Sequence, residues 1–286
     1  MKIEQTRTLD AGTLYPPEAQ TAGSAEFRML AVSLMAGAIG VGAGLIAYVL
    51  YNLIAFAVLM SGAAILVGQI SIGIERLVVI NLGLTAVSLF GMVIAIFIGI
   101  GLVSKEIEKR TLYTVLSRPV QRWEFIVGKF FGLVGTLVVN TFFMAIGVFV
   151  ALLWVSRRFQ LADGWVLVAL YFIVLQFLII TALALLFSSF SSPLLSAVFA
   201  FSLFVIGSFA EDLRGFASMA EGATRWLATA TAYLVPNFST LNVVSSVAHG
   251  QPVAPQLVLS NTLYALVYAG MAVSGAVLIF EHRNLK

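Results

Sequence analysis

The sequence has no cysteine and very little charge, and each shortage excludes a class of protein. Without cysteine there is no disulfide framework. Only 10% of the 286 residues are Asp, Glu, Lys or Arg, whereas a soluble domain usually carries about 25% because its surface faces water. The net charge of +3 is too small to indicate nucleic-acid binding. With 60% hydrophobic residues and a mean hydropathy of +1.03, the composition is that of a membrane protein.

The few charges are also unevenly spaced, so that long runs contain none. These runs cover residues 29–74, 77–104, 130–156, 164–210 and 226–280. A helix of about 20 apolar residues crosses the hydrocarbon core, where every backbone polar group must be bonded within the protein. We therefore expect an all-α polytopic membrane protein with about six transmembrane helices.

Two of the runs are too long for one crossing and contain turn signals. The run 164–210 is divided at Ser-Ser-Phe-Ser-Ser-Pro (188–193), where a proline typically begins a helix. The run 226–280 breaks at His-Gly-Gln-Pro (249–252), and Pro236 interrupts its first part, which is rich in Thr, Ser and Asn. We predict that 211–256 is an external segment at the membrane interface. The predicted spans are near 165–187, 193–210 and 257–280.

Positive charge predicts the orientation, because Lys and Arg favour the cytoplasmic side. With one span near 47–68 in the first run, 11 of the 16 basic residues are cytoplasmic, whereas an additional span there gives eight on each side. We therefore predict six spans in the plasma (inner) membrane with both termini cytoplasmic. Residues 1–28 form a tail, 29–286 a single transmembrane domain, and 29–46 either lie at the inner interface or extend the first helix.

Ionisable residues are absent from the middle of every predicted span. Only neutral polar groups lie there, such as Asn52, Asn140, Gln176 and Thr181. Ion-coupled carriers keep ionisable residues at depth because their function needs them. If this chain moves a substrate uphill, a partner must supply the energy. The charged pairs at outer span ends, such as Glu75 and Arg76, are expected to anchor the chain at the interface.

The most highly charged segment is the predicted cytoplasmic loop 104–129, with six basic and three acidic residues. Glu106 and Arg110 stand four residues apart in the favourable helical order. Ile107, Leu112, Val115 and Leu116 form an apolar stripe along this helix, and Pro119 ends it. We expect a short amphipathic helix that offers apolar anchors and charges to a soluble partner. A basic loop that only fixes topology and touches lipid head groups is the alternative.

The pattern from Lys105 to Lys129 resembles the first cytoplasmic loop of ABC-2 type transporter permeases, and most closely the multicopper-enzyme-maturation branch. Weaker likeness continues through Leu183–Pro193 and Tyr233–Phe238. In that family the loop forms a coupling helix, between spans two and three, that docks on the ATPase subunit. The residues that match the docking pattern are Glu106, Glu108, Arg110, Thr111, Leu112, Leu116, Arg118, Pro119, Arg122 and Trp123.

The resemblance implies a permease subunit that pairs with an ABC ATPase subunit and with a second permease copy, among membrane lipids. ATP would be bound by the partner, and this chain would hold no cofactor. The rival hypothesis is a membrane anchor or scaffold that transports nothing. Substrate and direction of transport stay open.

Motifs for chemistry within the chain are incomplete. Gly128-Lys129 lacks the earlier glycine and the following Ser or Thr of a P-loop, so no ATPase site is expected. The two histidines, His249 and His282, are predicted on opposite sides of the membrane and cannot share a metal. We therefore expect neither a catalytic site nor a metal site.

Overall fold

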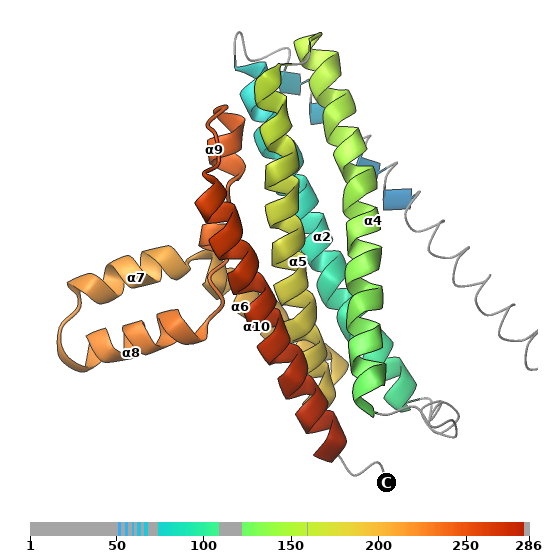
Figure 1. Cartoon of the computed structure of the whole chain (residues 1–286), viewed down its shortest axis with the longest axis vertical. Helices are drawn as coiled ribbons and strands as arrows, with labels where there is room; N and C mark the ends of the chain where they lie inside the picture. Colours follow the sequence, from blue (N-terminus) through green and yellow to red (C-terminus); the bar gives the residue numbers. More distant parts are fainter. Residues whose placement is uncertain are drawn as a thin grey trace, which may run out of the picture. The chain divides into compact units, whose positions relative to one another are not determined.

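The computed structural model describes residues 51–52, 55–56, 59, 62–63, 66–67, 74–108, 122–158 and 160–282. In these residues the chain is helical and contains no strand, which confirms the predicted all-α class (Figure 1). From α2 onward every element belongs to the unit Asn52–Lys286. The elements are α2 (Glu75–Glu108), α4 (Arg122–Ser156), η2 (Leu161–Asp163), α5 (Gly164–Phe190), α6 (Pro193–Ser208), α7 (Ala210–Met219), α8 (Gly222–Leu234), η3 (Ser239–Leu241), α9 (Val244–Ala248) and α10 (Pro255–His282).

The helix α5 lies at the centre of a bundle and packs against α2, α4 and α10 (Figure 1). Its sequence is apolar almost all round, as expected for a helix buried on every side. Phe172, Ile173 and Phe177 of α5 are at most 2% exposed and form part of the core. The core therefore follows the length of α5.

Among the described residues, four helices are long and apolar enough to cross a membrane, and each coincides with a region where the sequence predicts a span. They are α2, α4, α5 and α10; a fifth span results if α6 and α7, bent by 59° at their junction, are counted as one broken crossing. The chain is therefore a multi-pass membrane protein. The tail 1–28, the segment 29–46 and most of the predicted span 47–68 lie outside the described residues. The count of six spans stays a prediction.

Successive bundle helices run in opposite directions, so their ends form two groups. At one end α2 finishes, α4 begins, α5 turns into α6, and α10 finishes (Figure 1). The turn from α5 to α6 has an extended Ser192 followed by Pro193 at the first helical position, as the sequence predicts. The segment 109–121 therefore connects two helix ends at the same end of the bundle as the carboxyl end of α10.

The helices α7 and α8 pack together as a hairpin beside the bundle (Figure 1). They have 10 and 13 residues, too few for either to cross a bilayer, for which about 20 are needed. Exposed Phe216 and Trp226 alternate with exposed charges such as Arg214 and Arg225. This mixture is typical of helices that lie in a membrane interface. The external location of 211–256 stays a prediction.

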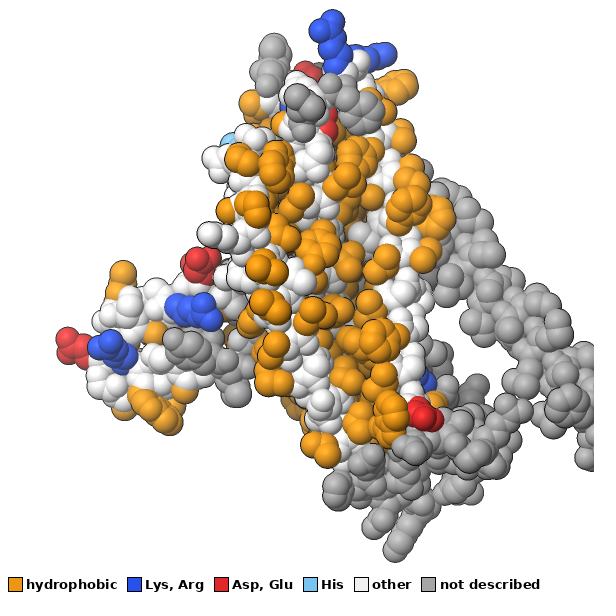
Figure 2. Space-filling view, in the orientation of Figure 1, with side chains coloured by type: hydrophobic (Ala, Val, Ile, Leu, Met, Phe, Trp, Pro, Cys, Tyr) orange, Lys and Arg blue, Asp and Glu red, His pale blue; other side chains and the backbone are white. Residues whose placement is uncertain are grey.

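Apolar side chains cover the face of the bundle shown in Figure 2, and the charged side chains visible there lie at its ends and on the α7–α8 hairpin. Large exposed side chains include Phe131 and Trp154 of α4, Leu194 of α6 and Met271 of α10. In water such a surface would be costly, but in hydrocarbon it needs no cover. The surface therefore agrees with the composition.

One ion pair joins the beginnings of α2 and α5. Arg76 donates to Asp163, whose side chain is only 3% exposed and also accepts a 2.7 Å hydrogen bond from the backbone N–H of Gln160. The sequence predicts only an anchoring role at the interface for Arg76. The carboxylate partner comes from 87 residues away, a contact that local pattern does not reveal.

Candidate functional site

The predicted docking residues fall at and between the ends of two bundle helices. Glu106 and Glu108 lie in the last turn of α2, and Arg122 and Trp123 begin α4. The remaining six lie outside the described residues: Arg110, Thr111, Leu112, Leu116, Arg118 and Pro119. Because α2 and α4 pack together, the two arms of the loop leave the same end of the bundle. The docking role itself stays a prediction.

The first turns of α4 are held firmly by the core. Ile126 is completely buried, and the ring of Phe125 stacks on Phe280 of α10 with centroids 6.0 Å apart. The ammonium of Lys129 lies 4.3 Å from the centroid of the Phe125 ring, a cation–π distance. By contrast Trp123 is 44% exposed. The first turns of α4, where the loop ends, are therefore anchored to the core, and the side chain of Trp123 beside them is exposed.

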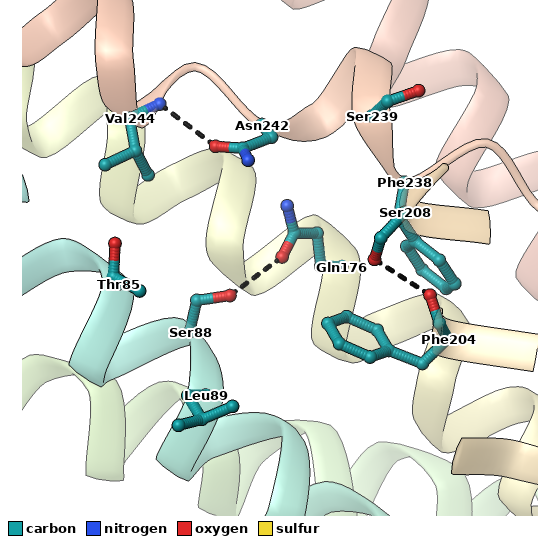
Figure 3. A pocket seen from close by; sticks show the side chains of 10 residues that line it. All are labelled: Thr85, Ser88, Leu89, Gln176, Phe204, Ser208, Phe238, Ser239, Asn242 and Val244. Atoms are coloured by element: carbon teal, nitrogen blue, oxygen red, sulfur yellow. Dashed lines mark hydrogen bonds between the residues drawn. The ribbon is translucent and has the colours of Figure 1, made fainter. Parts of the chain in front are cut away.

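A second feature, which the sequence did not predict, is a polar pocket inside the bundle (Figure 3). It has a volume of about 190 Å³. The side chains come from α2, α5, α6 and the stretch from Phe238 to the first residue of α9. They are Thr85, Ser88, Leu89, Gln176, Phe204, Ser208, Phe238, Ser239, Asn242 and Val244.

Gln176 is the central polar group of this pocket. The residue is only 5% exposed and lies in the middle of the membrane-spanning helix α5. The Ser88 hydroxyl donates to Gln176 Oε1 at 3.1 Å, and Gln176 Nε2 donates to the backbone carbonyl of Leu241 at 3.1 Å. A buried amide without partners would cost a few kcal/mol in a membrane. Here it links α2, α5 and η3.

The segment 235–243, which contains the short helix η3, forms one wall, and residues of α6 and α10 satisfy its backbone. The N–H of Phe238 donates to the carbonyl of Gly207 at 3.0 Å. The N–H of Asn237 donates to the Tyr264 hydroxyl at 2.7 Å, and Asn261 Nδ2 donates to the Thr240 carbonyl at 3.0 Å. Buried irregular backbone is tolerated only where such partners exist. Residues from α6 and α10 therefore fix this wall.

The pocket combines hydroxyl and amide groups with an aromatic surface. The rings of Phe204 and Phe238 lie 5.4 Å apart at 49° to each other. None of the ten lining residues is charged. Among the described residues, no group of three or more His, Cys, Asp or Glu side chains is placed to hold a metal. The arrangement fits an uncharged polar molecule better than an ion.

The sequence marks Gln176 as a neutral polar group at depth, and it marks the stretch interrupted by Pro236 as rich in Thr, Ser and Asn. Nothing in the sequence brings them together, and nothing in it points to Ser88, Ser208 or the two phenylalanines. Each is a common residue on an apolar helix, and nothing in the local pattern separates it from a packing residue. The hydrogen bonds of Gln176 cross 88 and 65 residues of chain.

The model of the family described as ABC-2 family transporter protein matches residues 18–285, nearly the whole chain. No curated protein matches the sequence.

Proposed function

Because the chain belongs to the ABC-2 family of transporter proteins, we propose that it is a permease subunit that moves its substrate with ATP hydrolysed by a separate ATPase. Family membership makes it a membrane component of an ABC transporter. The coupling to an ATPase is the further step, and it is supported by the loop 104–129. The helices that bracket this loop pack side by side, and its α4 arm is fixed to α10. A displacement of the loop by the ATPase would therefore be transmitted to α2, α4 and α10 through these contacts.

The energy source follows from what the spans contain. In the described helices α2, α4, α5 and α10, charged residues lie only toward the ends. Ion-driven carriers keep ionisable groups in the middle of their spans. The incomplete P-loop at Gly128-Lys129 supports a chain without its own ATPase. ATP bound by the partner subunit is then the remaining source.

The complete assembly that we propose contains two ATPase subunits and a second permease copy. Both termini of this chain lie in the cytoplasm, and the complex stands in the plasma (inner) membrane. Membership of the multicopper-enzyme-maturation branch rests on the loop residues from Lys105 to Lys129 and is part of the same proposal.

Co-purification separates this function from that of a membrane anchor or scaffold. The tagged full chain is expressed together with any ABC ATPase that is encoded beside its gene, and the complex is purified in detergent. We expect a stoichiometric complex that hydrolyses ATP in lipid nanodiscs. A neighbouring ATPase that fails to co-purify and whose turnover is unchanged by the chain would support the scaffold instead.

The proposed topology is tested with single cysteines, which the natural sequence lacks. The variants Asp10→Cys, Val120→Cys and Lys286→Cys should resist a membrane-impermeant maleimide added to intact cells, whereas Ala220→Cys should react. All four should react after permeabilisation, which controls for burial. Outside labelling of Asp10→Cys would establish an additional span in the first apolar run, and protection of Ala220→Cys in intact cells would place the α7–α8 hairpin inside.

A further inference from the structure

The polar pocket contains more hydrogen-bonding groups than its own contacts use. Figure 3 shows the polar ends of Thr85, Ser88, Gln176 and Asn242 lying toward one space. Asn242 accepts one bond through Oδ1 from the N–H of Val244, at 3.3 Å, and its amide nitrogen lies on the pocket side. Thr85 and Asn242 are exposed, so they stand at the mouth. A molecule inside would meet several uncharged donors and acceptors.

The mouth of the pocket adjoins an apolar groove along α2. This groove, of about 550 Å³, is lined by Leu59 and by mostly aliphatic side chains of α2 between Leu77 and Phe90. It shares Thr85 and Leu89 with the pocket. The two volumes therefore meet at these two residues. The pocket side of the junction carries hydroxyl and amide groups and is about half enclosed, whereas the groove side is almost wholly apolar and more open.

We propose that the pocket and groove together bind an amphiphile whose uncharged, hydroxylated head group occupies the pocket and whose alkyl chain lies in the groove. The volume of 190 Å³ corresponds to about six water molecules, the scale of a glycerol unit or a single sugar ring. Hydroxyls of the head group bond to Ser88, Gln176 and Asn242. The rings of Phe204 and Phe238 pack against its C–H surfaces.

The absence of charge from the lining excludes charged head groups. Burying an ion at membrane depth without a counter-ion or a metal is costly. Ordered water would bond to the same amides and hydroxyls, but water gains nothing from the aromatic wall or from the adjoining groove. An uncharged amphiphile uses all three surfaces.

Binding of the amphiphile can be measured with this chain alone, without the ATPase. The proposal gives a ligand class to a chain whose function is proposed above, but its test needs no ATPase. Failure of ATPase docking would leave it intact, and failure of ligand binding would leave the docking proposal intact.

The probe is radiolabelled octyl β-glucoside, used below its micellar concentration with the full chain in phosphatidylcholine nanodiscs. We expect saturable binding above the level of empty nanodiscs, displaced by unlabelled octyl glucoside. Octyl sulfate and octyltrimethylammonium should displace it at least tenfold less well. Uptake that does not saturate, or equal displacement by the charged compounds, would show a water-filled cavity and overturn the proposal.

Variants at the mouth locate the site. Thr85→Phe closes the junction and Asn242→Leu removes a polar group, and both positions are exposed, so the fold should tolerate them. Each should weaken binding at least tenfold. The matched control is Thr136→Phe on α4, a threonine outside the pocket and the groove. If both mouth variants bind the probe as well as the control does, the site is not this pocket.

Discussion

Truncating Leu112 and Leu116 together to alanine should weaken binding of the partner ATPase by about a hundredfold or more. Both leucines belong to the apolar stripe of the loop 104–129, which we propose enters a socket on the ATPase. Buried anchors in such sockets typically cost about 1–4 kcal/mol each when truncated, and every 1.4 kcal/mol is a factor of about ten. The measurement is the dissociation constant of purified ATPase from the chain in nanodiscs, with ATP turnover alongside.

Two controls separate docking from general damage. Leu213→Ala with Leu227→Ala truncates two leucines of the α7–α8 hairpin and should leave ATPase binding unchanged. Reversing charge at Arg110 or Arg118 should weaken binding, whereas the same change at Arg157 or Arg158, at the other end of α4, should not. Unchanged affinity and turnover in a stably inserted Leu112/Leu116 variant would mean that the loop only fixes topology.

Replacing Gly207 by valine should disrupt the wall of the polar pocket. Gly207 is buried near the end of α6, and a Cβ added there would meet the backbone carbonyl oxygen of Pro236 and the ring of Phe238. The backbone cannot move aside, because the N–H of Phe238 already donates to the Gly207 carbonyl at 3.0 Å. Overpacking of this kind typically costs about 1–3 kcal/mol and more against backbone. For Gly207→Val we therefore expect the free energy of unfolding to fall by about 3 kcal/mol or more.

The measurement is the midpoint of thermal unfolding in detergent, with elution of a single peak as the test of integrity. Gly215→Val on α7 is the control, since a Cβ at Gly215 meets no atom within 4 Å. We expect a large fall in midpoint, or aggregation, for Gly207→Val only. Equal midpoints for the two variants would show that the segment 235–243 does not pack against α6 as described.

The spans were predictable because lipid imposes a simple rule on sequence. A charge-free run of sufficient length must be a helix, and α2, α4, α5 and α10 follow the predicted runs closely. Pro193 also marks the start of α6, because proline suits the first helical position. The end of α6 was less predictable. The helix stops at Ser208 and bends, although the apolar run continues to Ala210 without proline.

The pocket could not be predicted, because it depends on which faces of distant helices meet. Ser88, Gln176 and Leu241 are brought together only by the packing of α2, η3 and α5. A serine on an apolar helix bonds equally well to its own backbone, as Ser208 does with the Phe204 carbonyl at 2.8 Å. The docking residues show the opposite case, because they are identified from the sequence rather than from the structure. The sequence pattern specifies all ten, and six of them lie outside the described residues.

The hydrogen bonds of Gln176 also bear on the order in which the helices can pair during synthesis. Its serine partner, 88 residues earlier, is already made when the amide leaves the ribosome, whereas its carbonyl partner comes 65 residues later. At about 5–20 residues per second, the carbonyl follows the amide by about 3–13 seconds. Over that interval Ser88 is the available native partner of an amide that has entered hydrocarbon. We therefore expect α2 to pair with α5 before η3 is seated, and the wall of the pocket to be complete only once α10 has supplied Asn261 and Tyr264.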